Sequence, residues 1–223
     1  LKARAALQMK DYTTAVDAST SLINAGNYPL INNADQYRSM FVNDMGSEVM
    51  WQIYLSPDEL GSATGTSFWG QYKENPADVR TDFIPSAKLI SIYEMTDIRF
   101  AAFFEPFMLS VSTGAQGAVY MFDKYPGNPD LIKILNVDQH YTNKPKPFRI
   151  AEQYLIAAEA YAGLQDATTG GKYLNELKKN RIAGYVEKTF GSADLLLAEV
   201  QDERHRELVG EGFRLVDLKR WGQ

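Results

Sequence analysis

The sequence contains no cysteine, only two histidines and no long apolar run. Without cysteine, the chain forms no disulfide, no zinc–thiolate site and no cysteine nucleophile. The histidines, His140 and His205, are far apart and belong to no metal-binding spacing such as HExxH, so no metal site is expected. No apolar run reaches the roughly 18 residues that cross a bilayer, so no membrane-spanning helix is expected either.

Positive charge and the common catalytic motifs are also scarce. With 23 Lys and Arg against 28 Asp and Glu, the net charge is −5, which argues against a nucleic-acid partner. The Gly-rich residues 61–65 lack the Lys-Ser/Thr of a phosphate-binding loop, and no GxSxG nucleophile motif occurs. We therefore expect neither enzyme activity nor a cofactor.

The stretch from Glu203 to Gly222 predicts a helix that is interrupted at Gly210 and Gly212 and carries charges where a core-facing stripe belongs. Ala193, Leu197 and Val200 set an apolar stripe at three- and four-residue steps. Arg204 and Glu207 then continue the same stripe. Because buried charge must be paired or costs several kcal/mol, we expect an Arg–carboxylate network that fixes how the last helices dock. The predicted network consists of Glu203, Arg204, Glu207, Glu211, Arg214, Asp217 and Arg220.

The same carboxylates also admit a catalytic reading. Glu203 and Glu207, or Glu207 and Glu211, would lie about 6 Å apart on one helix face, a separation used by retaining glycosidases. A general acid must be protonated near neutral pH, however, and neighbouring arginines such as Arg204 and Arg206 favour the ionised form. We therefore favour the structural role.

Two parts of the chain predict helical hairpins. Residues 1–25 read as two short antiparallel helices with a turn at residues 10–12, and small residues at their crossing positions are typical of tetratricopeptide units. Residues 149–163 predict a helix that is apolar on nearly every side and is therefore sandwiched between others. Gly170-Gly171 is expected to break it from a second helix at residues 172–182, which Gly184 would cap.

The middle of the chain, residues 30–145, has a different pattern. Residues 48–55 alternate like a strand, residues 100–104 and 118–125 read as further short strands, and residues 127–141 as a long polar loop. Residues 86–94 predict a helix that Ser86 caps. The fold class expected is mainly α, with tetratricopeptide-like helical hairpins and an irregular, loop-rich insert that contains short strands.

An aromatic loop at residues 67–72 is the favoured ligand site. A flat aromatic ring can cover the apolar C–H face of a sugar while nearby polar groups reach its hydroxyls. The candidate ligand-binding residues of this loop region are Trp69, Tyr72, Asn75 and Arg80. Tyr141 and Asn143, in the loop before Pro145, form a weaker second group that could equally be a solvated loop. The ring of Trp69 could instead pack its loop against the body of the protein.

The other two tryptophans are expected in the core. Trp51 lies in the alternating apolar run of residues 48–55, and Trp221 belongs to the terminal docking segment. Trp69 is therefore the tryptophan that we assign to ligand binding.

The C-terminal stretch also resembles a known family. ERxxEL followed by EGxRxxDLxRW, at residues 203–221, looks like the C-terminal signature of the SusD/RagB family. Companion motifs precede it: IPSAKLISIYEMTDIR at residues 84–99, RIAEQYLIAAEAYA at residues 149–162 and LNELKKNRIAG at residues 174–184. Arg149, Glu152, Glu159 and Trp221 match structural motifs of that family rather than a binding site.

The resemblance implies a non-catalytic lipoprotein of the outer membrane that binds glycans on the extracellular face. It further implies delivery of the glycan to a SusC-like TonB-dependent transporter, and a membrane link only through an N-terminal lipid anchor absent from this chain. The expected organisation is a scaffold hairpin at residues 1–29, a ligand-facing insert at 30–145 and a C-terminal scaffold at 146–223. The chain, which starts within a helix, is expected to be part of a longer protein. Binding of peptides or other nutrients on the same scaffold, or a helical-repeat adaptor that grips only a protein partner, remain open alternatives.

Overall fold

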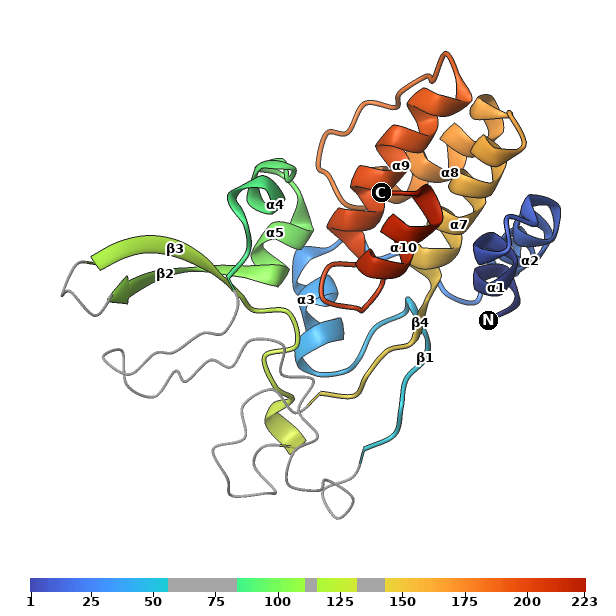
Figure 1. Ribbon diagram of the computed structural model, residues 1–223. Helices are drawn as coiled ribbons and strands as arrows, with labels where there is room; N and C mark the ends of the chain where they lie inside the picture. Colours follow the sequence, from blue (N-terminus) through green and yellow to red (C-terminus); the bar gives the residue numbers. More distant parts are fainter. Residues whose placement is uncertain (56–83, 111–115, 132–142) are drawn as a thin grey trace. The chain divides into compact units, whose positions relative to one another are not determined.

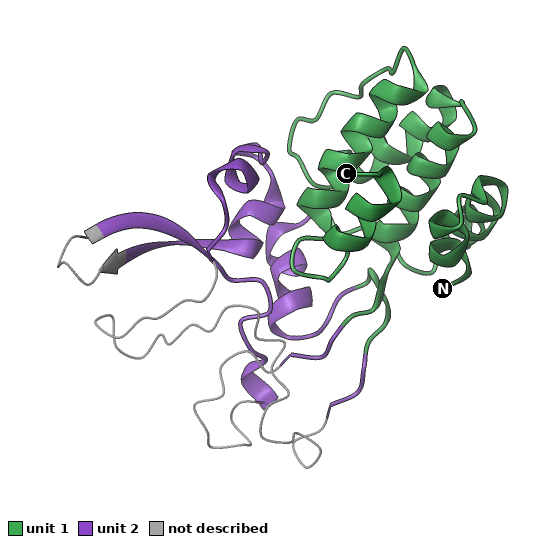
Figure 2. Cartoon of the chain, in the orientation of Figure 1, with its two compact units in different colours: residues 1–32, 47–52, 146–223 green, residues 33–46, 53–145 purple. Residues whose placement is uncertain are grey.

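A computed structural model describes residues 1–55, 84–110, 116–131 and 143–223 (Figure 1). The chain divides into two compact units, which Figure 2 shows in different colours. Residues 1–32, 47–52 and 146–223 form the first unit, called the scaffold here. Residues 33–46 and 53–145 form the second, called the insert. The chain therefore passes between the two units four times.

The described part of the scaffold is mostly helical, which confirms the expected fold class. Its elements are α1 (Lys2–Gln8), α2 (Tyr12–Asn24), α7 (Ile150–Gly163), α8 (Ala167–Lys179), α9 (Ala193–Glu207) and α10 (Arg214–Trp221), with the short strands β1 (Val49–Trp51) and β4 (Phe148–Arg149). The two strands pair antiparallel. No helix among the described residues combines the length and the apolarity that a membrane span needs.

Helix α7 is the centre of the scaffold, as its apolar sequence predicts. It contacts α1, α2, α8 and α9. One side of α7, including Leu155, packs in a core with Leu174 of α8 and Leu196 of α9. The other side, including Ile156, packs against α1 and α2 through small residues such as Ala15. A helix that is buried on both sides in this way needs apolar residues around most of its circumference.

The α1–α2 hairpin has the expected turn. Lys10 adopts a left-handed backbone with φ of 59°, and the carboxylate of Asp11 accepts a hydrogen bond from the N–H of Thr14 at 3.1 Å. This cap satisfies one of the free N–H groups of the first turn of α2. The hydrogen bonds from Thr14 lower the pKa of Asp11.

The predicted break at Gly170-Gly171 is wrong, because both glycines lie inside α8. Asp166 caps that helix. A Cβ on Gly170 would lie 2.6 Å from the side chain of Leu196 and 2.9 Å from the carbonyl oxygen of Ala158. Glycine is therefore present for close helix packing rather than as a breaker. Helix α8 ends before Gly184, which has φ of 75° in a later turn, so the expected cap is also wrong.

The described part of the insert combines short helices with a two-stranded sheet. Its elements are α3 (Ala34–Val42), α4 (Ala87–Ser91), α5 (Ile98–Phe103), β2 (Phe104–Ser110) and β3 (Gln116–Phe122). Strands β2 and β3 pair antiparallel, from Phe104 opposite Phe122 to Ser110 opposite Gln116. Ser86 caps α4 as predicted, since its hydroxyl accepts from the N–H of Leu89 at 3.1 Å.

Aromatic rings form the core of the insert. Phe41 of α3 lies edge-on to Phe103 of α5, with ring centroids 5.4 Å apart, and to Tyr125 at 5.1 Å. The ammonium of Lys124 lies 4.0 Å from the centroid of the Phe103 ring. Such cation–π contacts favour burial of a lysine beside aromatic rings.

Two further expectations fail. Residues 100–104 are mainly helical, because Asp97 caps α5 by accepting from the N–H of Arg99 at 2.9 Å. A short apolar run does not by itself distinguish helix from strand. Trp51 is 54% exposed rather than in the core, since it lies on a three-residue strand and its ring packs only partly on Phe148, with centroids 5.9 Å apart.

Candidate functional site

The residues assigned to the ligand from the sequence lie outside the described residues. Trp69, Tyr72, Asn75 and Arg80 fall within residues 56–83, and Tyr141 falls within residues 132–142. Their role therefore stays a prediction.

Asn143, the other member of the weaker group, is described and fully buried in the insert. Its side-chain oxygen accepts from the N–H of Gly127 at 2.7 Å, and its amide nitrogen donates to the carbonyl of Val42 at 3.1 Å. The amide nitrogen also lies 3.3 Å from a carboxylate oxygen of Asp44. Asn143 therefore braces the insert and does not offer its amide to a ligand.

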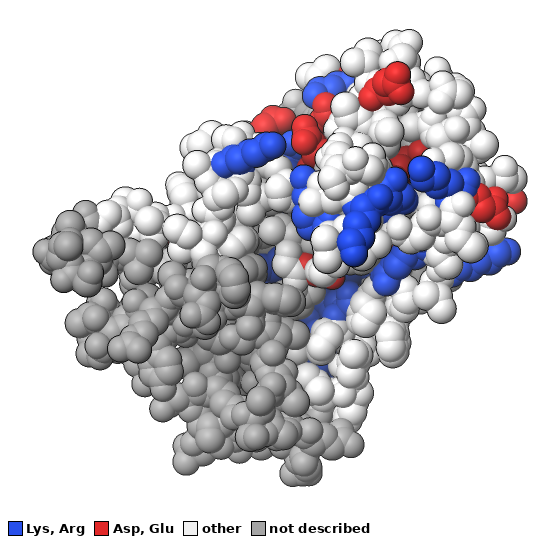
Figure 3. Space-filling model, in the orientation of Figure 1, with Lys and Arg blue, Asp and Glu red and all other residues white. Residues whose placement is uncertain are grey.

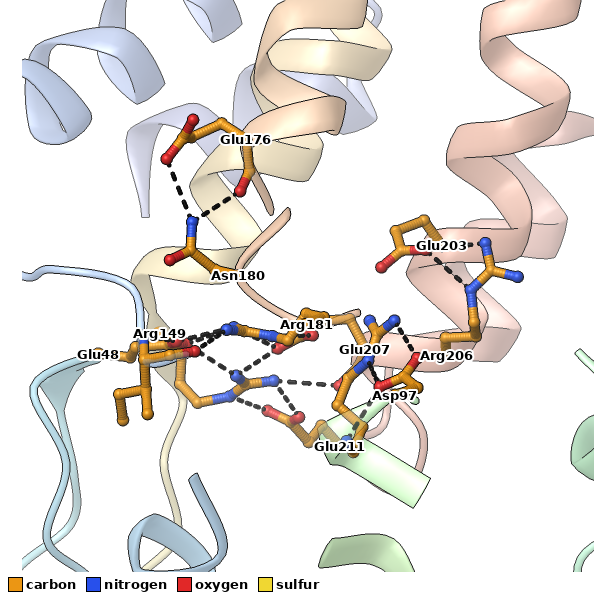
Figure 4. A network of polar contacts seen from close by, with 12 residues as sticks. Glu48, Asp97, Arg149, Glu176, Asn180, Arg181, Glu203, Arg206, Glu207 and Glu211 are labelled. Atoms are coloured by element: carbon orange, nitrogen blue, oxygen red, sulfur yellow. Dashed lines mark hydrogen bonds and ion pairs between the residues drawn. The ribbon is translucent and has the colours of Figure 1, made fainter. Parts of the chain in front are cut away.

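The scaffold contains a buried group of charges, which we call the crossing cluster: Glu48, Arg149, Arg181, Glu207 and Glu211 (Figure 4). Arg149 donates to Glu207 at 2.8 Å and to both oxygens of Glu211 at 2.5 and 3.0 Å. Arg181 donates to Glu207 at 3.0 Å and to Glu48 at 2.8 Å. Two arginines thus join Glu207 and Glu211, near the end of the sequence, to Glu48, which lies far from them in the sequence.

The crossing cluster holds the scaffold segments at which the chain passes to and from the insert. The N–H of Ile31 donates to Glu48 at 2.7 Å, and Arg181 donates to the carbonyl of Ile31 at 2.7 Å. Ile31 directly precedes one crossing, at residues 32–33. Glu48 lies in the short scaffold segment 47–52, and Arg149 follows the last crossing at residues 145–146. The cluster therefore fixes each of these segments within the scaffold.

A second group, the terminal cluster, docks α10 onto α7 and α9. It consists of Glu159, Arg204, Asp217, Arg220 and Trp221. Arg220 donates to both oxygens of Glu159 at 2.7 and 2.8 Å, and Arg204 donates to both oxygens of Asp217 at 2.9 and 2.8 Å. The indole N–H of Trp221 donates to Glu159 at 2.8 Å. Burial lowers the pKa of Arg204, but Glu159 and Asp217 outweigh it and raise that pKa overall.

A third group surrounds Glu199 on α9. Lys178 donates to Glu199 at 2.5 Å, Lys188 at 2.9 Å and Arg206 at 3.3 Å. Arg206 also donates to Glu203 at 2.8 Å. Burial raises the pKa of Glu199, but the hydrogen bonds from the two lysines reverse the effect and lower it overall.

The structure thus distributes the residues of the expected network over three groups. Glu207 and Glu211 meet at Arg149, and Glu203 pairs with Arg206. Arg214 does not join them: it is exposed at the start of α10 and pairs with no carboxylate in the described part of the chain. The sequence interpretation overlooked Glu48 and Arg181. Arg181 lies within the LNELKKNRIAG motif, and this position was the available signal for one of the two residues.

The geometry argues against the glycosidase alternative. Both oxygens of Glu207 accept hydrogen bonds from arginines, and its side chain is fully buried. Paired arginines favour the ionised carboxylate, whereas a general acid must be protonated and must reach its substrate.

On the face drawn in Figure 3, basic and acidic side chains of the scaffold are interspersed. That mixture does not favour a polyanion such as nucleic acid.

Comparison with known proteins places the chain in a family. The sequence profile of the SusD family matches residues 112–223. The SusD-like protein P25 of Formosa agariphila is 32% identical over an alignment of 119 residues, and the match covers 47% of this chain and 22% of that protein.

Solved structures extend the likeness over nearly the whole chain. A SusD superfamily protein from Bacteroides thetaiotaomicron matches with a TM-score of 0.75 and 26% identity, over 99% of this chain and 48% of that one. A SusD-like carbohydrate-binding protein from Bacteroides vulgatus matches with a TM-score of 0.74 and 24% identity, over 99% of this chain and 44% of that one. The chain therefore spans about half the length of these solved relatives. It belongs to the SusD family.

Proposed function

We propose that the protein is a non-catalytic component that binds glycans at the cell surface. The observation that carries this proposal is membership of the SusD family, with structural likeness along nearly the entire chain. One of the solved relatives is described as a carbohydrate-binding protein. The carboxylate of Glu207 on α9 is buried and paired with two arginines, which supports binding rather than catalysis.

Within this proposal, the insert contacts the ligand and the scaffold supports it. Trp69 and Tyr72 would stack on the C–H faces of sugar rings, while Asn75 and Arg80 would bond to hydroxyls. Tyr141 would add a further ring. The buried crossing cluster supports this assignment of roles to the two units, because it fixes the scaffold segments from which the insert extends.

The test is Trp69→Ala in the intact protein, with oligosaccharide binding measured by calorimetry. We expect the affinity to fall about fivefold or more, because the ring loses a stacking contact of about 1 kcal/mol or more. The melting temperature should change little. Trp51→Ala is the matched control, since Trp51 is a tryptophan that is 54% exposed and belongs to the scaffold. Unchanged affinity of Trp69→Ala across a glycan panel would show that the site assignment is wrong.

The same measurements separate the alternatives. Binding of peptides without any binding of glycans would select a peptide-binding relative. Recovery of a protein partner in pull-downs, with no binding of any small ligand, would select an adaptor.

We further propose that the intact protein is lipid-anchored on the extracellular face of the outer membrane and delivers its glycan to a SusC-like TonB-dependent transporter. The support is the family resemblance. Mild-detergent extracts of outer membranes should yield a complex of the protein with a transporter barrel. Isolation of the protein free of any barrel, under conditions that preserve other membrane complexes, would contradict this part.

A further inference from the structure

The scaffold contains a cavity of about 300 Å³ that none of the functional assignments above uses. It lies where the α1–α2 turn, the C-terminal end of α7, the first turns of α9 and the end of α10 meet. Its volume is at the lower end of the range of about 300–1,000 Å³ for small-molecule sites. A single ring with its substituents therefore matches it better than an extended chain does.

Two aromatic rings line the cavity, and each is fixed from behind. Tyr12 packs on Gly163, where a Cβ would lie only 2.5 Å from the tyrosine ring. Trp221 is held by its hydrogen bond to Glu159 at 2.8 Å, and the guanidinium of Arg220 lies 5.2 Å from the centroid of a Trp221 ring. Both aromatic residues are half-buried, so each retains exposed surface. Rings fixed in this way lose little freedom when a ligand stacks on them.

The polar groups of the cavity are available to a ligand. The side chains of Lys10, Asp194 and Gln201 have no hydrogen-bond or ion-pair partner among the described residues. Arg220 and Glu159 bond to each other, but Nη1 of Arg220 is buried without a partner in the described part of the chain. A buried N–H without a partner is unfavourable, so an oxygen of a water or of a ligand is expected beside it.

The charges in the cavity balance. Lys10 and Arg220 are basic, while Asp194 and Glu159 are acidic. A site of this kind does not select a strong anion or cation. Apolar ring faces combined with an amide and both signs of charge match a ligand that is neutral overall, with an apolar face and a hydroxyl-rich rim.

We propose that this cavity is a second ligand site, on the scaffold, that binds one neutral sugar ring. It is separate from the site proposed on the insert and does not depend on it. The scaffold would then contribute its own contact to a saccharide, in addition to its supporting role.

The test is titration of the intact protein that carries Trp69→Ala with D-glucose, D-galactose and D-mannose, followed by calorimetry and by the NMR signal of the Trp221 indole N–H. The signal is assigned by its loss in Trp221→Phe. We expect saturable binding of at least one sugar and a shift of that signal. Adding Gln201→Ala should weaken the affinity about fivefold, the effect of one lost hydrogen bond. Gly163→Ala, which displaces Tyr12, should weaken it at least as much.

Asp202→Ala is the matched control, because Asp202 is exposed and directly follows Gln201 on α9 without lining the cavity. It should leave the affinity unchanged, and melting temperatures should show that all variants are folded. Absence of saturable sugar binding would overturn the proposal, as would unchanged affinity in both Gln201→Ala and Gly163→Ala. Saturable binding of free amino acids in place of sugars would also overturn it. Every sample carries Trp69→Ala, which should weaken the insert site, and the Trp221 signal, Gln201→Ala and Gly163→Ala report on the cavity alone. Failure of the cavity proposal is therefore distinguishable from failure of the insert site.

Discussion

Replacement of Glu48 tests how the crossing cluster stabilises the scaffold. In Glu48→Ala, the buried N–H of Ile31 loses its acceptor at 2.7 Å, and Arg181 loses one at 2.8 Å. A buried donor left without a partner costs about 1–3 kcal/mol. Removal of one partner from a buried ion pair costs about 3–5 kcal/mol in all. We therefore expect Glu48→Ala to lower the free energy of unfolding by about 3–5 kcal/mol.

Urea denaturation measures this change, and Glu176→Ala is the matched control. Glu176 is exposed on α8 and accepts a hydrogen bond at 3.1 Å from Asn180, which directly follows that helix (Figure 4). Exposed substitutions of this kind usually change stability by less than about 0.5 kcal/mol. Should Glu48→Ala prove as mild as Glu176→Ala, the bracing role assigned to Glu48 would be refuted.

Further predictions concern the same scaffold. Burial raises the pKa of Glu48 above its ordinary 4.5, against the opposing effect of Arg181, so the folded protein binds this proton more tightly than the unfolded chain does. The stability linked to that proton is present at low pH and is lost as pH rises through the folded pKa. Glu48→Gln has no such proton to lose. In urea titrations, the free energy of unfolding of Glu48→Gln relative to wild type should therefore rise from about pH 4.5 upward. Gly170→Ala should destabilise α8 by about 1–3 kcal/mol in thermal melts despite the higher helix propensity of alanine, because its Cβ would lie 2.6 Å from Leu196. Asp217→Ala should lower the free energy of unfolding by about 3–5 kcal/mol, since Arg204 loses both of its bonds to that carboxylate. Arg214→Ala should lower it by less than about 0.5 kcal/mol, because Arg214 is exposed. Equal losses in the two variants would contradict the structure.

Sequence periodicity predicted the helices of the scaffold, but not the bounds of α8. The apolar circumference of α7 indicated a sandwiched helix, and the structure confirms it. The charged positions Arg204 and Glu207 continue an apolar stripe, and both side chains are buried. Such predictions succeed because they rest on contacts whose spacing repeats within a few residues.

The failures have a common physical cause, which is that tertiary contacts decide between local alternatives. Gly170 can break a helix or permit close packing, and only the approach of Leu196 selects the second. The need of Glu207 for a basic partner follows from its stripe, but the identity of Arg149, 58 residues away, does not. The alternating pattern of residues 48–55 predicts that Trp51 is in the core. Among the described residues, however, its strand β1 pairs on one side only, with the two-residue strand β4, and this leaves Trp51 largely exposed.

The crossing cluster has a consequence that an apolar core of the same size would lack. Removing two opposite charges from water is costly, so a buried ion pair adds little net stability compared with well-packed apolar residues. Arginine–carboxylate bonds are directional, however, and a shift of one segment along its axis breaks them. Ile31 and Arg181 are joined to Glu48 by bonds of 2.7 and 2.8 Å, and the N–H of Ile150 donates to the carbonyl of Glu48 at 2.9 Å. These bonds set the register of segments that are far apart in sequence. Apolar contacts would tolerate sliding between those segments, and charge therefore fixes where the chain leaves the scaffold and where it returns.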